Sequence, residues 1–324
     1  MNLIEAFEQG KTDIRDGLPE KTIETWQSKI FFFGDKVFKV YKYEKNSFVD
    51  FSDRSQRDSF YEKDFSWNHF FSPSIYADLI SFTERDGRWI SMINQNADDH
   101  AIRMRRIDAS SGINDLMRHG AFSVEDADRV AVDLTDQLIA FTRSRKSELR
   151  DVFEIGWQKL FLKRLEETRQ FGYSAEQYIE KNVTDTVIDA LLSRVSDDSY
   201  FLNFDDTNQE IAIDNHSDNI YYSDNGRTIV LDVVMTERTW RVADRNFNIC
   251  RLGVDMAILG RRELADSLYA TYKSRYQDFP NMARLVYELY NAFLKGAYLH
   301  LMDDHDRAKR YMAFVMNNLQ DVKK

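Results

Sequence analysis

Short runs of aromatic and β-branched residues dominate the chain before residue 108, and they predict a β-rich region. The runs at 29–33 and 36–41 flank Gly34-Asp35, so we expect a hairpin with a two-residue turn. Apolar residues at 57–71 recur every three or four positions, which predicts a helix that stops before Pro73. Further strands are expected at 21–25, 75–82, 89–93 and 101–107.

The pattern changes after residue 108, where apolar residues take on helical spacing. Helices are expected at 126–142, 154–171 and 184–195, and from residue 250 to the end of the chain. A short β island interrupts them, with strands at 210–213, 220–222 and 228–231 and a turn at 223–227. The pattern predicts an α+β protein with a β-rich lobe at 1–107 and a helix-rich lobe at 108–324.

Glycine is scarce, at 12 of 324 residues, and its positions exclude two nucleotide-binding loops. A Walker phosphate loop needs glycines five positions apart, followed by Lys and Ser or Thr, and no two glycines have that separation. A dinucleotide fingerprint begins with Gly-x-Gly, which the sequence also lacks. A nucleotide must therefore be held in another way.

Charge and cysteine content limit the expected partners and compartment. The formal net charge is −10, and an acidic surface disfavours binding to nucleic-acid backbones. Cys250 is the only cysteine and is expected in the core, so no intrachain disulfide can form, which fits a reducing compartment. The N-terminus has acids where a signal peptide has bases, and no apolar run reaches the ~18 residues of a membrane span. We expect a cytoplasmic protein with no membrane or nucleic-acid partner.

Oxygen-bearing side chains gather in the β island, at Asp214, Asn219 and Asp232. A hairpin folded at 223–227 would place Asn219 roughly opposite Leu231, about one rung from Asp232, where cross-strand neighbours lie ~5 Å apart. Mg²⁺ prefers such oxygens together with substrate phosphates. Asp214 would remain as a carboxylate that accepts a proton in phosphoryl transfer. Asp and Asn also favour loops for conformational reasons, so the spacing alone leaves a structural interpretation open.

Lys39 lies inside the apolar strand at 36–41, and Glu62 lies on the helix that follows. A lysine at such a position is either a solvated strand residue or one directed into a cleft, where Glu62 could pair with it. The order of the elements is a more specific signal than Lys39 or Glu62 alone. That order is hairpin, strand lysine, helix glutamate, hinge strand, helices, Asp-x4-Asn, hairpin and Asp.

In this order of motifs the sequence resembles the aminoglycoside phosphotransferase and choline kinase branch of the protein-kinase-like fold. More narrowly, it resembles an uncharacterised bacterial family of aminoglycoside-phosphotransferase-like proteins. The resemblance covers residues 20–260. The matching positions are Glu24-Thr25, Lys39, Val49-Asp50-Phe51-Ser52, Glu62, Asn68, Pro73, Met104-Arg105-Arg106, Asp214, His216, Asn219, Asp232 and Asp255.

The resemblance implies a two-lobed kinase-like fold in which the first lobe binds ATP. Lys39 would hold the α- and β-phosphates, and Glu62 would orient it. The segment 104–108, with Met104 and Arg106, would be the hinge that binds adenine through its backbone.

The resemblance also implies roles in the second part of the chain, where the catalytic loop and the metal-binding hairpin span 210–234. Asp214 would be the catalytic base, supported by His216. Asn219 and Asp232 would bind Mg²⁺. Asp255 would brace the catalytic loop.

The sequence departs from the family pattern around the base. The usual loop reads His-Gly-Asp-Leu-His, but Ala212 and Ile213 replace the first His and Gly, and Asn215 replaces Leu. The lost histidine removes a hydrogen bond that braces the loop and leaves the base in place. The loop expected to cover the phosphates, at 25–28, contains no glycine.

The predicted function is an ATP- and Mg²⁺-dependent phosphotransferase that acts on a hydroxyl of a small molecule. The altered loop motivates one alternative, a catalytically impaired pseudokinase or nucleotide-binding regulatory module. A nucleotidyltransferase on the same fold is another. The presence of Lys39 together with Asp214, Asn219 and Asp232 favours catalysis.

Overall fold

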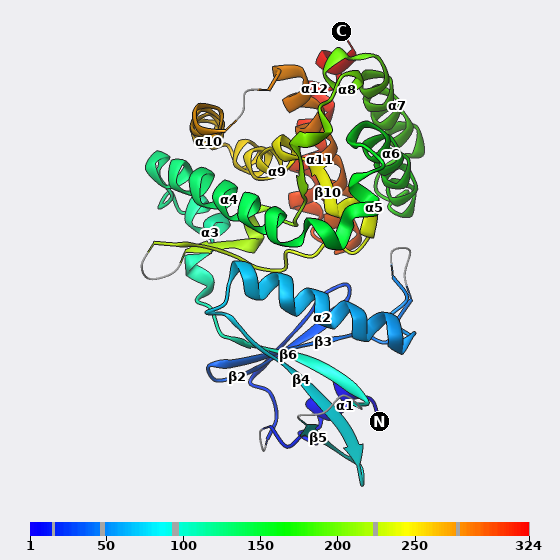
Figure 1. Cartoon of the computed structure of the whole chain (residues 1–324), viewed down its shortest axis with the longest axis vertical. Coiled ribbons are helices and arrows are strands. Elements are labelled where there is room, and N and C mark those ends of the chain that lie inside the picture. Colours follow the sequence, from blue (N-terminus) through cyan, green and yellow to red (C-terminus); the bar gives the residue numbers. More distant parts are fainter. Residues whose placement is uncertain (15–16, 46–48, 93–96, 223–225, 277–278, 324) are drawn as a thin grey trace. The chain divides into compact units, whose positions relative to one another are not determined.

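The computed structural model of the chain consists of two compact units (Figure 1). It describes residues 1–14, 17–45, 49–92, 97–222, 226–276 and 279–323. The first unit contains Met1–Ser111 and Ile229–Thr236, and the second contains Gly112–Thr228 and Glu237–Lys324. The boundary predicted after residue 107 is therefore slightly early. The segment Ile229–Thr236, expected in the second lobe, groups with the first unit because it bonds to a helix of that unit.

The first unit is built on a six-stranded antiparallel sheet with the order β1-β2-β3-β6-β4-β5. The predicted turn at Gly34-Asp35 joins β2 to β3, and the register of this hairpin pairs Ile30 with Lys39. The strands are β1 (Lys21–Glu24), β2 (Ser28–Phe33), β3 (Lys36–Tyr41), β4 (Tyr76–Arg85), β5 (Arg88–Met92) and β6 (Asp99–Arg105).

The two faces of this sheet pack against different helices. Successive side chains on a strand point to opposite faces, so Phe38 and Lys39 of β3 face different ways. Phe38 packs on Phe7 of α1 (Leu3–Glu8), with ring centroids 5.3 Å apart. Lys39 faces Asp64 of α2 (Arg54–Phe71), the long helix that runs along the sheet in Figure 1. Strand alternation thus directs the lysine toward an acid on α2.

Capping residues explain where the predicted helices begin. The helix expected at 57–71 begins at Arg54, because the Asp53 side chain accepts the backbone N–H of Gln56. The helix expected from 126 begins at Val124, because Ser123 forms a capping box with Asp126. The sequence pattern did not predict α1, α3 or β10, which have 6, 6 and 3 residues and are too short to show a period.

The second unit is mainly helical, with a small sheet formed by β7 and β10. Its core contains Trp157, Phe161, Phe247 and Tyr287, which pack ring against ring. Cys250 is buried, as expected. The elements are α3 (Ile113–Arg118), α4 (Val124–Arg145), α5 (Arg150–Phe153), α6 (Trp157–Ser174), α7 (Lys181–Asp197), α8 (Ser199–Leu202), β7 (Gln209–Ile211), β10 (Val242–Asp244), α9 (Arg245–Ile258), α10 (Arg262–Arg275), α11 (Asn281–Leu301) and α12 (His305–Lys323).

The predicted β island is present. β8 (Ile220–Tyr222) pairs with β9 (Thr228–Val230), whose first residue belongs to the second unit. Residues 223–225 of the predicted turn, like residue 93 of the predicted strand at 89–93, lie outside the described residues. No helix in the described part of the chain is both long enough and apolar enough to span a bilayer.

Candidate active site

Lys39 lies at the centre of a buried ion-pair cluster in the first unit. Its side chain is only 7% exposed, and Nζ lies 3.1 Å from Asp64 Oδ2 and 2.6 Å from Asp232 Oδ1. Tyr41 lies two residues farther along the same face of β3, and its hydroxyl donates to Asp64 Oδ2 at 2.5 Å. Lys39 is therefore not a solvated strand residue.

The ion-pair partner of Lys39 on α2 is Asp64 and not Glu62, which corrects the prediction. Glu62 is exposed, whereas Asp64 is 1% exposed. Residues two positions apart on a helix, such as Glu62 and Asp64, point about 200° apart around the axis, so the two acids cannot share a face. The apolar spacing of Phe60 and Tyr61, which are buried with Asp64, could have revealed that this acid lies on the inner face.

Asp232 is held against the cluster by backbone contacts within the first unit. Its φ is +53°, in the left-handed region, and its N–H donates to the Tyr76 hydroxyl at 3.1 Å. The next residue, Val233, donates its N–H to Asn68 Oδ1 at 3.1 Å, and Asn68 Nδ2 donates to Asp64 Oδ1 at 2.6 Å. Asn68 thus links α2 to the segment that carries Asp232. The Asp232 side chain is 60% exposed, so its other oxygen remains accessible.

The cluster fixes the charge of Lys39. Burial alone would lower the pKa of Lys39, but the carboxylates of Asp232 and Asp64 outweigh it and hold that pKa well above its ordinary value. Burial raises the pKa of the Asp64 carboxyl, against the attraction of Lys39. Lys39 is therefore a permanent cation at neutral pH.

The predicted hinge differs in part from the expectation. Met104 is half-buried at the end of β6, and Arg106 is exposed. The N–H groups of Arg105 and Arg106 donate to the carbonyls of Ile75 and Asp35, each at 2.8 Å. The N–H of Arg106 is therefore not available to adenine, because it is already used within the first unit.

The glycine-free loop at 25–28 is a closed turn. The N–H of Thr25 donates to the Ser28 carbonyl at 2.8 Å, and the two hydroxyls lie 2.9 Å apart. Gln27 Nε2 donates to the Thr236 hydroxyl at 2.9 Å. Side-chain hydrogen bonds thus shape this loop, where a phosphate-binding loop of other folds uses glycine.

Asp214 lies three residues after β7 in the second unit, and its closest charged partner is Arg251 of α9. Arg251 Nη2 lies 2.5 Å from Asp214 Oδ1, and His216 Nε2 lies 3.7 Å from the same oxygen. Burial alone would raise the pKa of Asp214, but Arg251, His216 and Lys295 together outweigh it and hold that pKa below its ordinary value. Asp214 is ionised at neutral pH, as a proton acceptor must be. The sequence reasoning did not identify Arg251.

Hydrogen bonds from α9 and α12 brace the loop around Asp214. Asp255 Oδ2 accepts the N–H and the hydroxyl of Ser217, both at 2.8 Å, and its Oδ1 accepts the Tyr311 hydroxyl at 2.7 Å. These contacts correspond to the bracing role that the resemblance implies for Asp255. The Asn215 side chain donates to the Asn248 carbonyl at 2.8 Å. The Asn248 side chain also bonds to the residues on either side of Ala212, where the family histidine is missing: it accepts the N–H of Ile213 at 3.4 Å and donates to the Ile211 carbonyl at 3.2 Å.

His216 lies beside a second group of charged residues, formed by Asp218 of the same loop, Lys295 of α11 and Arg307 of α12. Its Nδ1 lies 3.0 Å from Lys295 Nζ, and Asp218 forms ion pairs with Lys295 at 3.0 Å and with Arg307 at 2.7 Å. Burial and the nearby Lys295 lower the pKa of His216, so its ring is neutral at pH 7 and can accept a hydrogen bond from the lysine. Lys295 and Arg307 were not predicted from the sequence, because α11 and α12 are distant along the chain.

The two residues predicted to bind Mg²⁺ belong to different units. Asn219 is in the second, where its Nδ2 donates to the Asp214 carbonyl at 2.8 Å and leaves its Oδ1 to accept another ligand. Asp232 is in the first and has an accessible carboxylate oxygen. Amide and carboxylate oxygens are the donors that Mg²⁺ prefers. Within the described ranges, no group of three or more His, Cys, Asp or Glu side chains could hold a metal ion.

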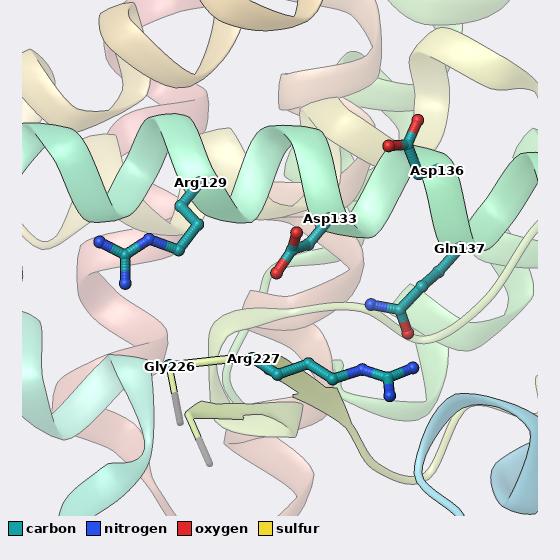
Figure 2. A pocket seen from close by; sticks show the side chains of 6 residues that line it. All are labelled: Arg129, Asp133, Asp136, Gln137, Gly226 and Arg227. Atoms are coloured by element: carbon teal, nitrogen blue, oxygen red, sulfur yellow. The ribbon is translucent and has the colours of Figure 1, made fainter. Parts of the chain in front are cut away.

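A hollow of about 460 Å³ lies in the second unit, apart from the predicted site residues (Figure 2). Side chains from α4 reach toward the segment before β9, and Asp133 and Gln137 bond to Thr228, the first residue of that strand. Two of the side chains that line the hollow, Asp133 and Gln137, therefore help to position the start of β9. Its lining residues are Arg129, Asp133, Asp136, Gln137, Gly226 and Arg227.

Solved structures that are similar to this chain include a choline kinase and two aminoglycoside phosphotransferases. The choline kinase from Cryptosporidium parvum Iowa II matches with a TM-score of 0.55 at 12% sequence identity. The match covers 94% of this chain and 88% of the choline kinase chain. A thermostable mutant of aminoglycoside phosphotransferase APH(4)-Ia, in a ternary complex with AMP-PNP and hygromycin B, has a TM-score of 0.52 at 14% identity, with 93% and 95% covered. The GDP and kanamycin complex of APH(2")-IIia has a TM-score of 0.51 at 11% identity, with 99% and 97% covered.

These similarities establish the fold across nearly the whole chain. No protein-family model matches the sequence, and no curated protein matches it either. The α+β architecture expected from the motif order is confirmed as the fold of aminoglycoside phosphotransferases and choline kinases.

Proposed function

We propose that this protein is an ATP- and Mg²⁺-dependent phosphotransferase that transfers the γ-phosphate to a hydroxyl of a small molecule. The observation that carries the proposal is the buried Lys39, held between Asp64 and Asp232. Burying Lys39 together with Asp64 is a poor way to gain stability, because the desolvation of the two charges offsets much of their attraction. Such a cluster is better explained by a ligand that uses it.

In the proposed reaction the acceptor oxygen attacks the γ-phosphorus of ATP. The bond from that phosphorus to the bridging oxygen breaks, and ADP leaves with the electron pair. The hydroxyl proton passes to the Asp214 carboxylate, which is ionised and one-third exposed. Lys39 would hold the α- and β-phosphates, and Asp64 would hold Lys39 in place.

Asp232 and Asn219 are the residues that would hold Mg²⁺. When bound, the ion neutralises charge on the phosphates. The accessible oxygen of Asp232 and the free Oδ1 of Asn219 fit the donor set that this ion prefers. The adenine would contact the backbone of the hinge at 107–108, since the N–H of Arg106 already donates to the Asp35 carbonyl.

The test is ATP turnover with a metabolite and antibiotic library, in wild type and in Asp214→Asn. A general base contributes about 10²- to 10⁴-fold, so Asp214→Asn should reduce turnover by that order. Asp189→Asn, at an exposed acid on α7, is the matched control and should leave the rate unchanged. Equal rates for wild type and Asp214→Asn would remove Asp214 from the mechanism.

A nucleotide-binding regulatory module without turnover is the second candidate. The ion pair between Arg251 and Asp214 favours it, because a carboxylate held by arginine is a weaker proton acceptor. Both candidates predict that ATP with Mg²⁺ raises the melting temperature, because a ligand of the folded state stabilises it. Stabilisation without turnover of any acceptor would favour the regulatory module, and no stabilisation at millimolar ATP would contradict both.

The acceptor is proposed to be a small molecule, and the cytoplasm is the proposed location. The sequence argument from the acidic net charge supports the first point by disfavouring nucleic acid. Fractionation of cells that express the protein at its natural level would test the second.

A further inference from the structure

Arg164 of α6 is a buried cation without a carboxylate partner. It is 1% exposed, and its Nη2 donates to the Val242 carbonyl at 3.0 Å and to the Thr239 carbonyl at 3.4 Å. Within the described part of the chain, no Asp or Glu lies within ion-pair distance of its guanidinium. Glu167, an acid on the same helix, instead bonds to Trp240 Nε1 at 2.6 Å and pairs with Lys163 at 3.3 Å.

Aromatic rings surround the Arg164 guanidinium but do not satisfy its N–H groups. The guanidinium carbon lies 5.1, 5.3 and 5.8 Å from the ring centroids of Phe247, Trp157 and Trp240. A ring stabilises a cation through its face, whereas the donors of arginine lie at the edges of its plane. Nε and Nη1 of Arg164 are both buried without a hydrogen-bond partner in the described structure. Burial lowers the pKa of Arg164 to about 10, which reflects this lack of compensation.

Arg251 is a second cation close to Arg164. Phe247, whose ring contacts Arg164, lies four residues before Arg251 on α9, so both residues lie on the same helix face. The positive charge of Arg251 opposes that of Arg164, and both favour the ionised form of the Tyr290 hydroxyl. Nη2 of Arg251 contacts Asp214, whereas its Nη1 is buried without a partner.

We propose that Arg164 and Arg251 form a binding site for an anionic group. Their three unpartnered nitrogens, Nε and Nη1 of Arg164 and Nη1 of Arg251, match the several oxygens of a carboxylate or a phosphate. An anion would compensate a positive charge that the protein leaves unbalanced, since Arg251 contacts the carboxylate of Asp214 and Arg164 has no carboxylate within ion-pair distance in the described residues. The three nitrogens are buried, whereas the side chains of Arg251 and Asp214 are 12% and 33% exposed, so an anion would approach from the side of Asp214.

This site defines the class of acceptor. If the proposed function holds, on which this step rests, the acceptor is a hydroxyl compound with a carboxylate or phosphate group. The anionic group would contact Arg164 and Arg251, and the hydroxyl would face Asp214, which Arg251 also contacts.

The binding test uses inorganic phosphate, without nucleotide and with EDTA, measured by calorimetry at constant ionic strength. Wild type should bind phosphate saturably, and Arg164→Met and Arg251→Gln should bind at least about tenfold more weakly, a loss of about 1.4 kcal/mol. Lys163→Gln changes an exposed lysine on the same helix and should bind like wild type. Circular dichroism, with Arg164→Lys as a variant that keeps the charge, shows whether the fold is retained.

Lys39→Met separates this site from the phosphate-binding residues of the first unit, and it should retain phosphate binding. Absence of saturable binding to wild type would overturn the proposal. Wild-type affinity in both arginine variants would also overturn it, as would loss of binding in Lys39→Met alone.

A kinetic test compares hydroxy acids with their amides as acceptors. Arg164→Met should raise KM for the acid at least about tenfold and leave KM for ATP and for the amide unchanged. Phosphate binding without turnover of any acceptor would reject the phosphotransferase and retain the anion site. Turnover of amides and acids with equal KM in wild type would reject the anion site and retain the phosphotransferase.

Discussion

The two units contain buried charge clusters with opposite imbalances. In the first unit, one cation, Lys39, contacts two carboxylates, Asp64 and Asp232. In the second unit, Arg251 contacts the carboxylate of Asp214, and Arg164 is buried with no carboxylate within ion-pair distance in the described residues. The first cluster has a surplus of negative charge, and the second has a surplus of positive charge.

An unbalanced charge attracts a ligand of opposite sign, and it is costly where it is buried, as at Arg164. A divalent cation matches the first cluster, and an anionic group matches the second. The net charge of −10 gives no sign of the second cluster, because it sums over the whole surface. The comparison shows that local charge, and not the total, indicates the ligand.

Asp232→Asn tests the negative surplus of the first unit and has the largest expected effect. The amide keeps a contact to Lys39 but removes the charge that would hold Mg²⁺. ATP turnover should fall by about 10³-fold, the upper range for loss of one group that stabilises developing charge. The rise in melting temperature with ATP and Mg²⁺ should become equal to that with ATP and EDTA. An unchanged difference between the two conditions would contradict the metal assignment.

Lys39→Met tests whether the cluster in the first unit depends on its single cation. It leaves Asp64 buried without a counter-charge, which should lower the free energy of unfolding by about 3 kcal/mol. Denaturant unfolding measures this change, and Lys36→Met, at an exposed lysine on the same strand, should have little effect. The added change Asp64→Asn should restore part of the loss. Arg164→Met, which removes a surplus cation, should by contrast leave stability nearly unchanged.

Glu210→Gln tests whether the positive surplus of the second unit is confined to Arg164 and Arg251. Burial raises the pKa of Glu210 to about 7, and Arg245, 3.6 Å away, offsets this only in part. Because the pKa of Glu210 is higher in the folded than in the unfolded protein, its protonated form favours folding. This contribution to stability is fully present below the ordinary pKa of 4.5 and is lost as pH rises through about 7. The glutamine variant should be more stable than wild type by about 2 kcal/mol near pH 8 and equal to it near pH 4. Parallel stability curves would show that other charges compensate Glu210.

Glu62→Gln has the smallest expected effect and tests which acid of α2 belongs to the cluster. Glu62 is exposed, so its substitution should change unfolding free energy by less than about 0.5 kcal/mol. ATP turnover should also stay at the wild-type rate. Asp64→Asn is the matched variant and should lower both. A loss of turnover in Glu62→Gln would restore the original prediction.

Lys39 and Glu62 show which features the sequence pattern could predict: the environment of the lysine, but not its ion-pair partner. The alternation of β3 correctly predicts that Lys39 lies among apolar neighbours, because strand period is a local property. The partner on α2 depends on which face of the helix meets the sheet. Asp64 lies on the apolar face with Tyr61 and Asn68, so the helix period contained that information. The motif order pointed to Glu62, which the helix directs outward.

Arg251 illustrates what the sequence pattern does not contain. Asp214 and Arg251 are far apart along the chain, and neither spacing nor composition joins them. Arg164 comes from a third segment, α6, and meets α9 only through the packing around Phe247. Such contacts depend on how helices pack, which a local period does not specify.

The sequence by itself determined the division into a β-rich and a helix-rich region, the main strands and helices and the exclusion of two glycine-rich loops. These features follow from local periodicity and from residue type. The tertiary structure alone decided that Asp64 pairs with Lys39, that Ile229–Thr236 joins the first unit and that Arg251 contacts Asp214. The physical reason is that ion pairs and burial depend on neighbours from distant segments, and only the packed chain brings those neighbours together.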